Sequence, residues 1–379
     1  IVVDDVQFQR FGEIPYQDIP VAHLLQLAVG MGDHQLKGES LGEVAESFAV
    51  GGTDQIVQIL PPCAFLFLQR NSLYPGLLEL LLTDVLMPGG RVLFNEPLTV
   101  QELAINHSIL APGQKVARPS RTGSILGTGY TRGTSNAAAL TSRAAGFLHE
   151  SFLEIENISP DLLTNYFPVM AKCLLAHCAT WKDDTVSSLL NSIPNRTGND
   201  KDTISRFLGY GQMDLTRIFE CTQQRVTLIG YGALHSEEGH LYKLPLPVSI
   251  SGPVMWRQLT VTLAWFSPVN PLNQVYRKAK LWYDFPDDNV DSILNVNRKF
   301  YDNHTVMRGT LHHEIFDGSR ASAFVDGTDL NIRVNCKQDA SPFDESIKYG
   351  FAVTLEVLPV TNLDLYTEIR AKVQPQVQV

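Results

Sequence analysis

The sequence lacks any hydrophobic run that approaches the roughly 20 residues a transmembrane helix needs. It also has no surplus of basic residues, because 30 lysines and arginines stand against 40 aspartates and glutamates, a formal net charge of −10. A nucleic-acid surface requires clustered lysine and arginine to neutralise phosphates. The composition therefore argues against nucleic acid and against a membrane as partners of this chain.

Cysteine is scarce, and no Cys-x-x-Cys pair occurs. The five cysteines are Cys63, Cys173, Cys178, Cys221 and Cys336. An odd number without a pairing pattern predicts buried thiols in a reducing compartment rather than a disulfide framework. We therefore expect a cytoplasmic protein.

Several motifs of cofactor and metal chemistry are also missing. Gly127–Gly133 is rich in glycine but lacks the dinucleotide-binding spacing and the lysine of a P-loop. His235–His240 is not a helical His-Glu-x-x-His motif, and we interpret it as an exposed polar loop. His312–Glu314 lies in an alternating strand, which predicts one histidine facing out and the next facing in. We expect neither a cofactor nor a metal, and the absence of Gly-x-Ser-x-Gly argues against an unrelated α/β hydrolase.

The chain is long enough for two domains with hydrophobic cores, since 44% of its residues are hydrophobic. Residues 1–80 suggest helices at 24–29 and 41–50 and strands at 55–60 and 64–68. Residues 81–215 alternate short strands, glycine and proline loops, and helices at 160–178 and 183–192. Strand candidates then follow at 226–229, 259–265, 280–283, 310–316, 330–335 and 350–357. The later pattern predicts an antiparallel sandwich over 216–379.

One short motif carries most of the functional information. Gly133-Thr134-Ser135 runs directly into a helix rich in alanine and glycine, which would pack tightly in a core. Ser135 can be an N-cap with no chemical role. It can also be a nucleophile, because the start of a helix offers N–H groups and a positive dipole to a developing oxyanion.

The motif resembles the serine block of the subtilisin-like (S8) serine peptidases, Gly-Thr-Ser-x-Ala-x-Pro, with Ala139 in place of the proline. Proline in a first turn adds rigidity but takes no part in the chemistry. Further segments resemble the family in the expected order, at 84–90, 110–116, 174–181, 208–214 and 225–229. The resemblance covers roughly residues 80–379.

The resemblance implies a fold and an activity. The fold would be a subtilisin-like α/β catalytic part over 1–215, with a largely parallel sheet and helices, followed by the β-sandwich. The activity would be endopeptidase cleavage of peptide or protein substrates through an acyl-enzyme on Ser135. Large bacterial members of the family also imply an AAA-type ATPase as a partner.

The family's histidine and aspartate blocks do not occur in this sequence. Asp5 and His23 can be a divergent pair, or a surface aspartate and a histidine at the start of a helix. Asn71 can be the oxyanion asparagine or an ordinary loop residue. His149 lies fourteen residues beyond Ser135 on the same helix, on the order of 20 Å away, which is too far for a general base. Because the chain begins at Ile1, we expect it to be the C-terminal part of a longer subtilase. The alternative is a catalytically silent scaffold that binds peptides or proteins.

Overall fold

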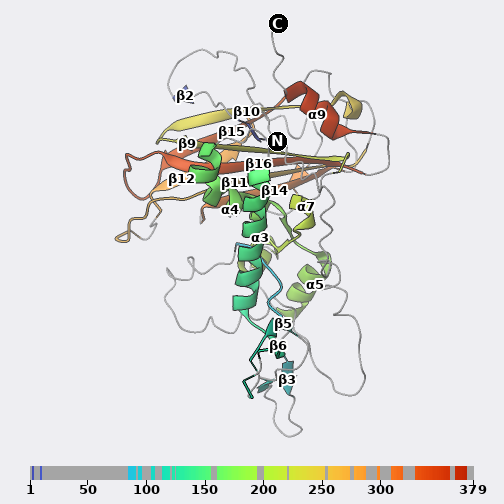
Figure 1. Ribbon diagram of the computed structural model, residues 1–379. Helices are drawn as coiled ribbons and strands as arrows, with labels where there is room; N and C mark the ends of the chain where they lie inside the picture. The colour runs from blue at the N-terminus through green and yellow to red at the C-terminus, as the bar shows by residue number, and fades with distance from the viewer. Residues whose placement is uncertain are drawn as a thin grey trace.

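The computed structural model describes part of the chain (Figure 1). The described residues are 2–3, 9–10, 84–90, 93–95, 104–106, 113–119, 122–123, 125–154, 160–193, 200–219, 222–251, 255–273, 277–286, 297–298, 309–318, 329–358 and 363–373. The candidates Asp5, His23 and Asn71, and the helices and strands expected within the first 80 residues, lie outside this part. No helix in the described ranges has both the length and the hydrophobicity needed to cross a membrane.

Two antiparallel sheets form the upper part of the molecule (Figure 1). The first has the order β1-β9-β16-β11-β14-β13, with β1 Val2–Val3, β9 Arg225–Leu234, β16 Ile347–Val357, β11 Arg257–Trp265, β14 Leu311–Gly318 and β13 Asn297–Arg298. The second has the order β12-β15-β10-β2, with β12 Ala279–Asp284, β15 Asp329–Gln338, β10 Glu238–Pro245 and β2 Gln9–Arg10. We call them sheet A and sheet B.

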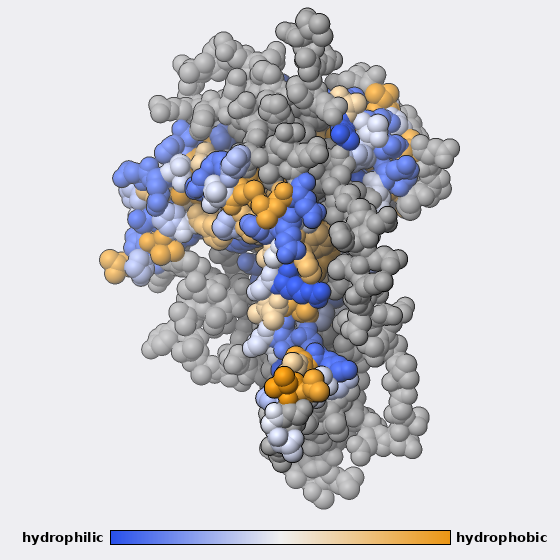
Figure 2. Space-filling model, in the orientation of Figure 1, coloured by the Kyte–Doolittle hydropathy of each residue, from blue (hydrophilic) through white to orange (hydrophobic). Residues whose placement is uncertain are grey.

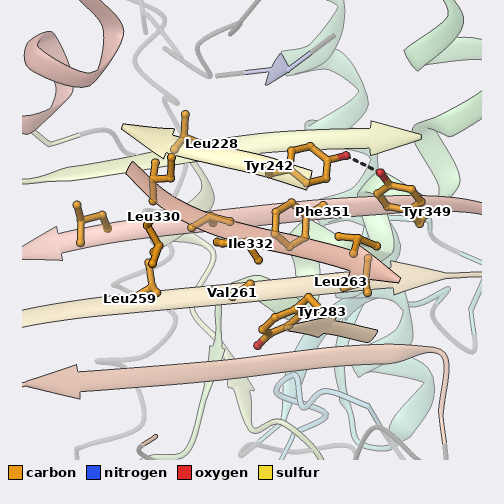
Figure 3. Packing of buried hydrophobic residues seen from close by; sticks show 14 of the residues in the cluster. Leu228, Tyr242, Leu259, Val261, Leu263, Tyr283, Leu330, Ile332, Tyr349 and Phe351 are labelled. Atoms are coloured by element: carbon orange, nitrogen blue, oxygen red, sulfur yellow. Dashed lines mark hydrogen bonds between the residues drawn. The ribbon is translucent and has the colours of Figure 1, made fainter. Parts of the chain in front are cut away.

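The sandwich core lies between sheets A and B. Alternate residues of β11, such as Leu259, Val261 and Leu263, point into it and are fully buried. They pack with Leu330 and Ile332 of sheet B, as the strand period of two requires (Figure 3).

A helical layer covers the other face of sheet A. Its elements are α3 Thr134–Glu154, the π-helical turn η2 Leu162–Tyr166, α4 Phe167–His177, α5 Asp183–Ser192, α6 Asp200–Leu208 and α7 Thr216–Phe219. Helix α4 packs on β11, β14 and β16, and α3 packs on α4. Ala264 and Ala352 of sheet A face this layer, so that sheet A contributes to two cores. The 3-10 turn η3 Val248–Ile250 and helix α9 Leu365–Val373 border the sandwich core.

The predicted subtilisin-like parallel sheet is absent from the described residues, and that prediction of the fold class is wrong. The short strands between residues 93 and 213 form three two-stranded antiparallel sheets instead: β3 Leu93–Asn95 with β4 Ala104–Asn106, β5 Gln114–Ala117 with β6 Thr128–Thr131, and β7 Ala179–Thr180 with β8 Gln212–Met213. Parallel pairing in the described part is limited to β1 with β9 and the single bridge from Leu86 to Gln212. Two-stranded sheets with strands of two to four residues do not form the continuous sheet that the helices of an α/β fold cover.

The sequence predicted that the alanine- and glycine-rich face of α3 packs tightly in a core, but most of that face is not buried. The buried residues of this helix are Ala144, Leu148 and Phe152. Ala138, Ala139 and Gly146 are exposed. The helix therefore packs along one stripe near its C-terminal half, and its N-terminal half projects away from the sandwich (Figure 1).

The antiparallel strands of the C-terminal half match the six strand candidates closely, each observed strand being longer at one or both ends. The pattern missed β10, because Glu238–Pro245 begins with polar residues. The division of the chain at residue 215 stays a prediction.

Candidate active site around Ser135

Ser135 is the second residue of α3 and its side chain is exposed. Gly133, just before the helix, has a φ of 141°, a conformation that residues with a Cβ rarely adopt. The Asn136 N–H donates to the Gly133 carbonyl (3.1 Å) and closes the turn that begins the helix. The Gly-Thr-Ser sequence thus turns the chain sharply and presents the serine at the tip of the helix.

A second glycine segment fixes this turn from outside. The Gly133 N–H donates to the Gly89 carbonyl at 2.8 Å, and the Asn136 side-chain amide donates to the same oxygen at 3.3 Å. A Cβ on Gly89 would lie 2.8 Å from the Gly133 oxygen, so that only glycine permits this approach. The serine turn is therefore held by the segment that the sequence places 44 residues earlier.

The β5–β6 hairpin (Gln114–Ala117 and Thr128–Thr131) completes the surroundings. The Gln114 amide donates to the Pro88 carbonyl at 2.9 Å. The Thr131 hydroxyl donates to the Asn136 side-chain oxygen at 3.1 Å. These bonds connect the hairpin, the 84–90 segment and the first turn of α3 around Ser135.

The arrangement suits a nucleophile. Among the described residues the Ser135 hydroxyl makes no hydrogen bond, in contrast to a serine that caps its own helix. The first turn of a helix also carries N–H groups that lack intrahelical acceptors, and its dipole favours negative charge. An oxyanion formed beside Ser135 would meet fixed donors.

The described histidines occupy other places. The His149 ring packs edge-on against Phe167, with 4.8 Å between ring centroids, near the far end of α3. His177 lies on α4 and His313 on β14, both buried between the helical layer and sheet A. No histidine of the described ranges contacts Ser135, and a base for this serine would come from residues outside them.

His177 and His313 hold a buried hydrogen-bond network instead. The His177 ring nitrogens lie 2.7 Å from the Thr262 hydroxyl and 2.6 Å from the Thr354 hydroxyl. The His313 ring lies 2.6 Å from the Thr262 hydroxyl and 3.1 Å from the Ala179 carbonyl. Burial lowers the pKa of His313 to about 3 and that of His177 well below its usual value. Both are therefore neutral residues of the core, in which Trp181 is buried as well.

Two lesser motifs differ from their interpretation. The expected polar loop at His235–His240 is wrong in part, because Glu238 and His240 are buried at the start of β10. His240 lies 2.6 Å from the Tyr349 hydroxyl, which in turn bonds the Tyr242 hydroxyl (Figure 3).

His312–Glu314 does form a strand, but both of its faces are buried, because sheet B covers one and α4 the other. Neither segment assembles a metal site: the described ranges hold no group of three or more metal-ligating side chains.

The three described cysteines, Cys173, Cys178 and Cys336, are free and buried, as the sequence predicted. Burial raises the pKa of the Cys178 thiol to about 12. The three cysteines contribute to the hydrophobic cores on the two faces of sheet A.

No protein-family model matches this chain, and no curated protein is significantly similar to it.

Proposed function

We propose that the chain is part of a serine endopeptidase in which Ser135 is the nucleophile. The observation that carries the proposal is the geometry of the serine: an exposed hydroxyl at the first turn of a 21-residue helix, with a glycine turn held from outside by Gly89. The resemblance of the same segment to the subtilisin-like serine block supports it.

In this reaction the Ser135 oxygen attacks a peptide carbonyl and loses its proton to a base outside the described residues. The new C–O bond gives a tetrahedral oxyanion, which N–H groups of the first helical turn stabilise. The C–N bond then breaks, the amine leaves with the proton, and the acyl group remains on Ser135 until water removes it. The AAA-type ATPase implied by the resemblance stays a prediction.

A catalytically silent peptide-binding scaffold is the second candidate. It is favoured by the position of His149, which packs against Phe167 rather than beside Ser135. The two candidates differ in whether Ser135 is chemically activated.

A fluorophosphonate probe distinguishes them, because it reacts covalently with an activated serine. We expect the wild-type chain to be labelled and Ser135→Ala to lose labelling by about 100-fold or more, since a triad serine contributes on that scale. The measurement is in-gel fluorescence after a fixed incubation. Mass spectrometry of the labelled peptide would locate the adduct.

Ser142→Ala is the matched control, because Ser142 is an exposed serine two turns further along the same helix. It should label like the wild type. A folded wild-type chain that is not labelled, or that labels equally after Ser135→Ala, would contradict the peptidase proposal and leave the scaffold.

A further inference from the structure

The charge around Ser135 is opposite to that of the chain as a whole. Between residues 103 and 149 there is no aspartate or glutamate, although the chain contains 40. The same stretch carries Lys115, Arg118, Arg121, Arg132 and Arg143. Charges further apart than about 10 Å are largely screened at 0.1 M salt, so a ligand at Ser135 responds to the charges nearest to it rather than to the net −10 of the chain.

The basic side chains that the structure describes lie on the β5–β6 hairpin and beside the Gly133 turn that precedes Ser135. Lys115 and Arg118 are exposed on β5 and just after it. A Cβ on Gly129 would lie 3.2 Å from Arg118 Cδ, so the glycine allows this arginine to lie flat across β6. The Arg132 side chain packs beside Gly90 and Gly113, directly before the Gly133 turn.

The tip of the same hairpin is hydrophobic. Ile125 and Leu126, in the loop between β5 and β6, are 85% and 87% exposed. Figure 2 shows hydrophobic atoms on the surface at the end of the molecule where Figure 1 places these strands. These two adjacent aliphatic side chains offer hydrophobic surface that a partner could cover.

The hairpin also offers backbone groups to a partner. In the described part of the chain, β5 and β6 pair with each other alone. Within the described residues, each strand therefore has an outer edge without a neighbouring strand, and an added strand could pair there through its N–H and C=O groups. An extended peptide on such an edge places alternate side chains on the two faces of the hairpin.

We propose that the β5–β6 hairpin binds extended acidic peptide segments that also carry aliphatic side chains, and that it thereby selects the substrates of Ser135. This selection rests on the proposed function, whereas the binding itself does not. Carboxylates of the peptide would pair with Lys115 and Arg118, and an aliphatic side chain would cover Ile125 and Leu126. A peptide fits better than a nucleic acid, because the aliphatic tip has no partner on a sugar-phosphate backbone.

The test is fluorescence anisotropy with a fluorescein-labelled peptide of alternating glutamate and leucine. A peptide with glutamine in place of glutamate is the comparison. We expect the glutamate peptide to bind more tightly, and Lys115→Gln with Arg118→Gln to weaken it about tenfold, as the loss of two partly exposed ion pairs predicts. Binding should also weaken as sodium chloride is added.

Lys337→Gln with Arg370→Gln is the matched control, because it removes two exposed charges from the sandwich region. It should leave binding unchanged. Equal binding of the two peptides, an equal loss in the control variant, or tighter binding of single-stranded DNA than of the glutamate peptide would each overturn the inference.

Fluorophosphonate labelling of the same variants separates this inference from the peptidase proposal. If Ser135 is labelled in the hairpin variant while peptide binding is lost, the hairpin acts in recognition, as inferred. If the peptide binds but Ser135 is never labelled, the peptidase proposal fails and the hairpin remains a peptide-binding surface.

Discussion

Gly211→Val is expected to destabilise the fold by on the order of 4 kcal/mol, among the largest effects of any single substitution. A Cβ at this position would lie 2.1 Å from the Thr180 carbonyl oxygen and 2.8 Å from the Trp181 nitrogen, both of which are backbone atoms. The residue also has a φ of 104°, which costs a residue with a Cβ a further 1–3 kcal/mol, roughly. The measurement is urea unfolding followed by tryptophan fluorescence.

Gly146→Ala is the control for Gly211→Val. Gly146 lies within α3, and nothing stands within 4 Å of an added Cβ. Alanine has the higher helix propensity, so this variant should be more stable by up to about 1 kcal/mol. Similar losses of stability in both variants would contradict the close contact of Gly211 with the backbone of Thr180 and Trp181.

Stability is expected to fall steeply as the pH is lowered from 7 to 5. Burial lowers the pKa of His313 to about 3 and of His240 to about 4, and it lowers that of His177 as well, from a usual 6.5. In this range the unfolded chain binds protons that the folded chain does not, so the stabilisation present above pH 6.5 is lost as the pH falls. His313 and His240 each account for about 2 kcal/mol at pH 5, and His177 adds to the loss in the same direction.

The acid effect is measured by urea unfolding at a series of pH values. His313→Gln isolates one contribution, because it removes a titrating group from between Thr262 and the Ala179 carbonyl. This variant should be less stable at pH 7 but should lose less stability than the wild type on acidification. A wild-type stability that does not change between pH 7 and pH 5 would rule out buried neutral histidines.

The antiparallel strands could be predicted from the sequence because their pattern is local. Alternation such as Leu259, Val261, Leu263 identifies a strand whatever its partners are. The alternation says nothing about which strands pair. That β16 lies between β9 and β11 depends on contacts between residues 84 to 131 positions apart in sequence.

The predicted parallel sheet failed for a related reason. Helices alternating with short apolar segments, as between residues 81 and 215, give the same sequence pattern whether those segments pair in parallel or antiparallel. In the structure, Thr180 and Gln212 pair as antiparallel neighbours. Helix α4 is covered by sheet A, whose strands the sequence pattern assigned to another domain.

The sequence predicted one residue of the candidate site, Ser135, but not the residues that hydrogen-bond to the turn before it. Ser135 follows from the Gly-Thr-Ser motif and from the helix that begins there. Gly89, Asn136 and Thr131 support the turn through bonds that only the folded chain creates. A signal was present in the Pro88-Gly89-Gly90 turn, because paired glycines often permit a close approach of two backbones.

The length of α3 determines how long a peptide must be to contact Ser135 and the sandwich at the same time. Ser135 and Phe152, which is anchored in the core, are seventeen residues apart on one helix, or about 25 Å. An extended peptide covers about 3.3 Å per residue, so roughly eight residues are needed to span that length. Under the proposed function, peptides shorter than this would contact the hairpin and Ser135 alone, whereas longer chains would be able to contact the sandwich at the same time.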